Sequence, residues 1–128
     1  MTQSILLFAS ENGETPFNRE RIVGVIESVV ETRSADRSAT SCLKNDNNIV
    51  WKLVVNDSNT YPIQIVFLGE QGSISVETFH EMGLQAAIDI QRAYEDEVYA
   101  WSEEASPLLA PISAINTPGE LATILKLR

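Results

Sequence analysis

Two stretches of alternating apolar and polar residues, 49–55 and 61–68, restrict the possible folds of this chain more than any other feature. Such alternation is typical of strands with one buried face. The residues between them, 56–60, read Asn-Asp-Ser-Asn-Thr, which is turn chemistry. Because strands joined by so short a connection are antiparallel neighbours, the sequence predicts a hairpin. Its inward-facing residues are Ile49, Trp51, Leu53, Val55, Ile63, Ile65 and Phe67.

Shorter apolar runs on either side of this hairpin predict further strands. These runs are residues 3–9, a short stretch around 40–43 within a Ser-rich connection, and 73–76. The last run follows Gly69-Glu70-Gln71-Gly72, which predicts a tight turn because glycine adopts the backbone angles that such turns require. We expect Ile74 and Val76 to face inward.

Two of the three predicted helices begin with proline in the first turn. Pro16 follows Thr15 as a candidate N-cap, and this helix should end near Thr32. Thr117 precedes Pro118, and Glu120 has the position of a capping-box acid, so a short terminal helix follows. Its inward-facing residues are expected to be Leu121, Ile124 and Leu125.

The remaining helix is predicted to be long, from Thr78 to Glu104. Thr78 and Glu81 have the spacing of a capping box. The apolar stripe consists of Phe79, Met82, Ala86, Ile90, Ala93 and Trp101. Glu97 conflicts with this pattern, because it projects onto the middle of the stripe. Three explanations remain open: the helix has left the core by then, it bends or frays near Asp96, or Glu97 has a buried partner.

Together these elements predict an α+β fold. We expect a small antiparallel sheet of three to five strands, with one long and one or two shorter helices packed on one face. A chain of 128 residues with 44% hydrophobic content is typical of one domain, here residues 1–128.

Charge is concentrated in residues 77–104. This segment holds eight acidic side chains and one basic one, which is −7 of the chain's formal net charge of −9. A one-signed field on a rigid helix attracts cationic partners and disfavours polyanions. The plain alternative is a solvated helix face that contributes only to solubility.

Motifs that would indicate catalysis or a cofactor are missing from the sequence. Cys42 is the only cysteine and His80 the only histidine, so a metal site would need carboxylates from distant segments. We read Cys42 as a small apolar side chain and His80 as a surface residue in the first turn of a helix. No nucleophile elbow or phosphate-binding loop is present. We therefore predict no catalytic residue, no metal and no cofactor.

The composition also bears on location and on classes of partner. The nine basic residues are scattered and the isoelectric point is near 4.5, which disfavours binding to nucleic acid or to an anionic membrane. The apolar run at 5–9 is too short for a signal sequence, and no stretch is long enough to span a membrane. We expect a cytoplasmic protein.

These features favour a non-catalytic protein-binding module. The hypothesis is a small acidic inhibitor, of the immunity-protein type, that neutralises a basic protein such as a secreted toxin or nuclease. Acids on the helix would steer the encounter, and aromatic residues among them would anchor the partner. The predicted contact residues are Asp89, Glu95, Asp96, Tyr99, Trp101 and Glu103.

Other functions remain open from the sequence. One is a small-ligand-binding domain or enzyme that uses carboxylates in a cleft between sheet and helix. Convergence of Glu95, Glu97 and His80 on one pocket would favour it, and an open surface would favour the binder. A secretion chaperone or adaptor, or a phosphate-mimicking decoy, would use the same charges.

Overall fold

The computed structural model describes residues 3–35, 42–43, 47–56 and 61–127. Seven strands and three helices lie in these ranges. The strands are β1 (Ser4–Phe8), β2 (Cys42–Leu43), β3 (Ile49–Leu53), β4 (Ile63–Leu68), β5 (Ser73–Glu77), β6 (Tyr99–Trp101) and β7 (Ala110–Pro111). The helices are α1 (Arg19–Arg33), α2 (Glu81–Tyr94) and α3 (Pro118–Ile124).

All seven strands form one antiparallel sheet in the order β2-β3-β4-β5-β1-β6-β7. The predicted hairpin is confirmed as β3 and β4, and β1 and β5 occupy the predicted strand segments. A short strand, β2, lies within the predicted 40–43 stretch, of which 40–41 fall outside the described residues. The α+β class is confirmed, but the sheet is larger than expected because β6 and β7 come from segments predicted as helix and irregular chain.

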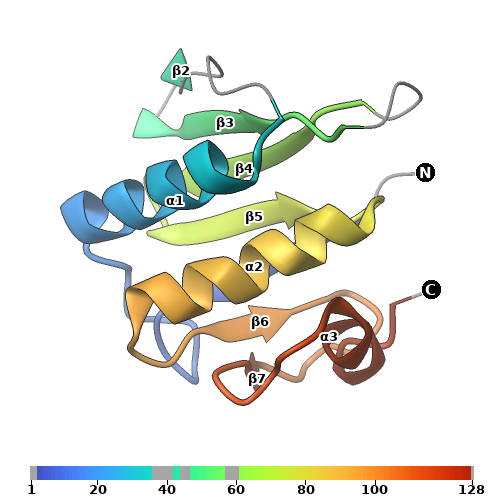
Figure 1. The fold of residues 1–128 in the computed structure, drawn as a ribbon. Coiled ribbons are helices and arrows are strands. Elements are labelled where there is room, and N and C mark those ends of the chain that lie inside the picture. Colours follow the sequence, from blue (N-terminus) through green and yellow to red (C-terminus); the bar gives the residue numbers. More distant parts are fainter. Residues whose placement is uncertain (1–2, 36–41, 44–46, 57–60, 128) are drawn as a thin grey trace.

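The molecule has two layers, with α1 and α2 side by side over one face of the sheet (Figure 1). The core between them contains alternate residues of each long strand, among them Ile5, Leu7, Ile65, Phe67 and Ile74. Within the described part of the chain, no helix covers the opposite face. Exposure differs along that face: Leu6 and Val66 are partly buried, whereas Val50, which pairs with Val66, is only 4% exposed.

Helix α1 begins at Arg19, three residues later than the sequence predicted. Asn18 is the N-cap, and its side-chain oxygen accepts a hydrogen bond from the Arg21 N–H at 3.0 Å. Phe17, expected in the helix, instead donates its N–H to the Gly72 carbonyl at 2.9 Å and is buried. The competing bond to the turn before β5 explains why the prediction of Thr15 as cap was wrong.

The capping box predicted at Thr78 is also wrong. His80 is the N-cap of α2, and its Nδ1 accepts a hydrogen bond from the Met82 N–H at 3.0 Å. Thr78 instead donates its N–H to the Gln3 carbonyl at 2.7 Å and so extends the pairing of β5 with the chain before β1. Tertiary pairing has therefore overridden a local capping signal.

Helix α2 ends at Tyr94, so the second half of the predicted long helix does not exist. Glu95 has a positive φ of 73°, which breaks the helical path. The Gln91 side chain then fixes the exit: its Nε2 donates to the Asp96 carbonyl at 2.8 Å, and its Oε1 accepts from the Val98 N–H at 2.6 Å. Gln91 is buried, so these bonds form away from solvent.

Glu97 lies beyond this break, so the explanation that the helix bends or frays near Asp96 comes nearest to the structure, in which the helix ends at Tyr94. The Glu97 carboxylate accepts hydrogen bonds from the Ser113 N–H at 2.8 Å and the Ser113 hydroxyl at 2.6 Å. It thereby ties the chain after α2 to the segment after β7.

Helix α3 begins as predicted. The Thr117 hydroxyl oxygen accepts from the Glu120 N–H at 3.2 Å, and the Glu120 carboxylate lies 3.1 Å from the same hydroxyl. Leu121 and Leu125 are buried, whereas Ile124 is 36% exposed, so the prediction that Ile124 faces inward is wrong.

Candidate interaction surface

The six predicted contact residues do not form one surface, because the element that was to carry them breaks at Tyr94. Asp89 lies on α2, and Glu95 and Asp96 lie in the exposed turn after it. Tyr99 and Trp101 lie on β6, and exposed Glu103 follows that strand. The structure therefore divides them between the helical layer and the sheet.

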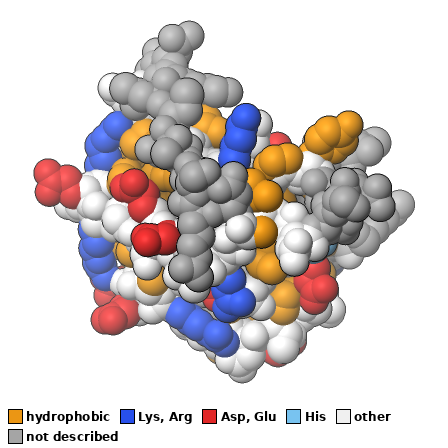
Figure 2. Space-filling view, turned by 45° about the horizontal axis from the view of Figure 1, so that its top comes forward, with side chains coloured by type: hydrophobic (Ala, Val, Ile, Leu, Met, Phe, Trp, Pro, Cys, Tyr) orange, Lys and Arg blue, Asp and Glu red, His pale blue; other side chains and the backbone are white. Residues whose placement is uncertain are grey.

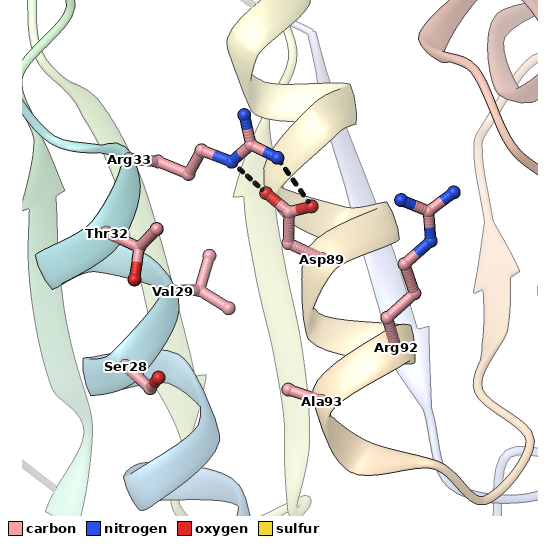
Figure 3. A pocket seen from close by; sticks show the side chains of 7 residues that line it. All are labelled: Ser28, Val29, Thr32, Arg33, Asp89, Arg92 and Ala93. Carbon is pink, nitrogen blue, oxygen red and sulfur yellow. Dashed lines mark hydrogen bonds and ion pairs between the residues drawn. The ribbon is translucent and has the colours of Figure 1, made fainter.

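Asp89 is paired within the molecule. Its carboxylate accepts two hydrogen bonds from Arg33 of α1, at 2.6 and 3.2 Å, and one from Gln85 at 3.0 Å (Figure 3). The pair lies in a shallow cleft of about 350 Å³ between α1 and α2. The Asp89 side chain is only 13% exposed, so its charge contributes little to an external field.

Asp96 is also paired, although it is more exposed. Its Oδ2 lies 2.8 Å from Nη1 of Arg21, whose guanidinium stacks 4.0 Å above the Tyr94 ring and also donates to the Tyr94 carbonyl. The hydrogen bond that Arg21 donates to Asp96 raises the pKa of Arg21 above its usual value, although desolvation of Arg21 opposes this. This arrangement places a cation at the C-terminal end of α2, where the helix dipole favours it.

The helical layer is consequently mixed in charge. Arg19, Arg21 and Arg33 of α1 and Arg92 of α2 lie among the acidic residues of the two helices. Figure 2, which looks onto the helical side and the β2–β3 edge, shows basic and acidic side chains interspersed. The expectation of a one-signed helix face is therefore wrong, because α1 supplies the compensating charges.

Tyr99 and Trp101 point to the uncovered face of the sheet. Between them Ala100 is fully buried, while both aromatic side chains are partly exposed. The β1–β6 register pairs Leu6 with Trp101 and Phe8 with Tyr99. Cross-strand neighbours share a face, so these four residues form a continuous apolar surface.

A shallow hollow of about 310 Å³ lies on this surface. Its lining consists of Leu6, Phe8, Asn12, Gly13, Trp101, Ser106, Pro107 and Leu109. Leu108, which lies between the lining residues Pro107 and Leu109 in the sequence, is 47% exposed. We use the name aromatic patch for Leu6, Phe8, Tyr99, Trp101 and Leu109.

Acidic residues follow both strands that carry the aromatic patch. Glu103 and Glu104 follow β6, and the Glu104 carboxylate lies 3.5 Å from Nε2 of Gln3. In the loop after β1, the Asn12 amide donates to the Glu14 carboxylate at 3.3 Å, and exposed Glu11 precedes Asn12.

Basic residues do not line the hollow within the described ranges. Lys52, which pairs with Gln64 in the β3–β4 register, lies four strands from β6, or about 19 Å at the usual strand spacing. Exposed Lys126 is nearer, because it follows Leu125, whose carbonyl accepts a hydrogen bond from the Ser102 hydroxyl at 2.6 Å. The described lining of the hollow itself therefore carries no positive charge.

The acids and the histidine that would favour an enzyme do not converge. His80 caps the start of α2 and Glu95 ends it, so they are about 20 Å apart at the rise of an α-helix. Glu97 is engaged with Ser113. Among the residues that the structure describes, no group of three or more His, Cys, Asp or Glu side chains is placed to hold a metal ion.

Sequence reasoning missed Leu6, Phe8 and Leu109 as parts of the site. The signal for the first two was present, since alternation in 3–9 places Leu6 and Phe8 opposite the buried Ile5 and Leu7. Their pairing with β6 carried no such signal, because β6 was assigned to a helix.

The fold and the patch define a class of protein: a two-layer α+β fold in which the sheet face opposite the helices carries partly exposed aromatic residues, as far as the described residues show. Comparison with protein-family models, curated proteins and solved structures gave no match. Over the described residues, no helix is long and apolar enough to cross a membrane.

Proposed function

We propose that this chain is a non-catalytic protein-binding module, a small acidic inhibitor that neutralises a basic protein by covering part of its surface. The observation that carries the proposal is the aromatic patch: Phe8, Tyr99 and Trp101 lie partly exposed on an uncovered sheet face, with Glu103 and Glu104 beside them. Aromatic side chains surrounded by polar groups are the usual anchors of protein interfaces.

Charge supports a basic partner over a second copy of the chain. A net charge of −9 makes self-association through an acidic surface unfavourable and accelerates the encounter with a cationic protein. A stable interface takes about 800 Å² from each partner. The chain exposes 7230 Å² in total, so such an interface needs only about a ninth of it.

The mode of binding should be face-on. The two edge strands, β2 and β7, have two residues each, and β7 includes Pro111, which lacks an N–H donor. Addition of a partner strand at either edge would therefore gain few hydrogen bonds. The aromatic patch lies on a sheet face and not at an edge.

The proposal is tested by affinity capture from a lysate of the source organism with three forms of the chain. We expect one basic protein to be retained by the wild-type chain and to be lost progressively at high salt. Trp101→Ala should abolish retention. Tyr61 is an 84% exposed aromatic residue that precedes β4, and Tyr61→Ala should leave retention unchanged.

Once the captured protein is purified, an assay of its own activity distinguishes an inhibitor from an adaptor. An inhibitor should suppress the partner's own activity at equimolar ratio, whereas a secretion chaperone or adaptor would bind and leave that activity intact. Retention of no protein, or equal retention by the Trp101→Ala and Tyr61→Ala variants, would contradict the proposed surface. A cytoplasmic location is part of the proposal and is checked by fractionation.

A further inference from the structure

We propose that the hollow in the aromatic patch receives one arginine side chain of the partner. This inference rests on the proposed function, since it specifies how a basic protein would be recognised at the same surface. Three features support it: aromatic residues in the lining, a carboxylate bonded to a polar residue of the lining, and the lack of a described basic residue of this chain in the lining.

Aromatic walls suit a guanidinium. Phe8 and Trp101 both line the hollow, and cations lie favourably over aromatic faces, with arginine and tryptophan the best pair. The chain uses this contact twice within its own fold: the Arg21 guanidinium lies 4.0 Å from the Tyr94 ring centre, and that of Arg19 lies 5.5 Å from the Phe67 ring centre.

The polar end of the hollow holds a carboxylate in place. Asn12 lines the hollow and accepts hydrogen bonds at its Oδ1 from the Ser10 hydroxyl at 2.8 Å and the Glu14 N–H at 3.0 Å. Its Nδ2 donates to the Glu14 carboxylate at 3.3 Å. The loop therefore ties the exposed Glu14 carboxylate to a residue of the lining, and we expect a guanidinium that enters the hollow to reach it.

Arginine fits this combination better than lysine does. A planar guanidinium can stack on a ring and present a two-pronged donor to a carboxylate at the same time. An ammonium is a compact and strongly hydrated charge that gains less from an open aromatic site. A phosphate group or nucleic acid would be repelled by Glu14 and by Glu104 beyond the rim.

The test uses three blocked tripeptides, Ac-Gly-Xaa-Gly-amide, with arginine, lysine or citrulline at the centre. Citrulline keeps the shape of arginine without its charge. Binding is followed by ¹H–¹⁵N NMR of the full chain. We expect the arginine peptide to shift the Trp101 indole N–H and the Gly13 amide saturably. The indole of Trp51, which is 2% exposed, serves as an internal reference that should not move.

Matched variants assign the effect to the site. Glu14→Gln should weaken the arginine peptide about five-fold, as expected for an exposed ion pair, while Glu27→Gln on α1 removes the same charge elsewhere and should have no effect. Trp101→Ala should weaken it about three- to five-fold, read at Gly13, and Trp101→Phe should restore most of the affinity. Dispersed spectra verify that each variant is folded.

Equal binding of arginine and lysine peptides, binding of citrulline, or indifference to Glu14→Gln would overturn the inference. If the peptides fail while a captured basic protein still requires Trp101, the arginine site is wrong and the proposed function stands. If the arginine peptide binds at Trp101 and no basic protein is retained, the site exists and the proposed function is wrong.

Discussion

Replacing Gln91 with leucine should destabilise the fold far more than the size of the change suggests. The Gln91 side chain makes two hydrogen bonds, to the Val98 N–H at 2.6 Å and to the Asp96 carbonyl at 2.8 Å. Val98 is fully buried, so loss of the first bond leaves an unsatisfied donor, at a cost of about 1–3 kcal/mol. With about 1 kcal/mol for the second bond, the expected loss is about 2–4 kcal/mol.

The measurement is urea unfolding followed by tryptophan fluorescence, with Gln85→Leu as the matched control. Gln85 lies on the same helix and makes one hydrogen bond, to Asp89, from a partly exposed position. That control should lose less than about 1 kcal/mol. A Gln91→Leu variant no less stable than Gln85→Leu would refute the conclusion that Gln91 fixes the exit of the chain from α2.

Two further pairs of substitutions test the packing described above. Gly72→Ala should cost about 2 kcal/mol, because Gly72 has φ of 66° and an added Cβ would overlap Pro16. Gly24→Ala should instead stabilise α1 by about 0.5–1 kcal/mol, because no atom lies within 4 Å of the added Cβ. Chemical denaturation measures both free energies of unfolding, and equal effects would contradict the close approach of Gly72 to Pro16. Asp89→Asn should cost about 1–2 kcal/mol, because the Asp89 side chain is only 13% exposed. Asp96→Asn should cost less than about 0.5 kcal/mol, because the Asp96 side chain is 72% exposed. Thermal melts measure both, and a larger loss for Asp96→Asn would contradict this difference between the two ion pairs.

The elements that the sequence predicted correctly are those whose signals are local. Alternation and a short connection define β3 and β4, and the capping residues of α3 lie within four positions of one another. The turn at Gly69–Gly72 also follows from its own residues. In each case the interactions that decide the structure join residues close in sequence.

The two predicted helix starts that failed depend on partners far along the chain. The start of α1 is displaced because Phe17 bonds to Gly72, and the start of α2 because Thr78 bonds to Gln3. The end of α2 combines a side chain's local bonds, from Gln91 to Asp96 and Val98, with a bond to the Tyr94 carbonyl from Arg21, more than seventy residues away. Periodicity carries no information about such contacts, and tertiary bonds outweigh capping preferences worth about 1 kcal/mol.

The partner-contact residues named from the sequence stay a prediction, but their placement has changed. Tyr99 and Trp101 were placed on a helix and lie on a strand, and Glu103 follows that strand. Asp89 and Asp96 were named for their charge, which the structure pairs with arginines of α1. A charge count does not reveal which acids are compensated within the fold.

The break after α2 also determines what the acidic segment can do. In a continued helix, Tyr99 and Trp101 would project about 200° apart and could not share a face. In a strand, residues two apart lie on the same side, and pairing with β1 adds Leu6 and Phe8 to that side. The bonds of Gln91 therefore do more than end a helix, because they allow two aromatic side chains to lie on one face of the sheet. Any variant that loosens this exit should weaken partner binding together with β6 pairing, even though Gln91 itself is buried and touches no partner.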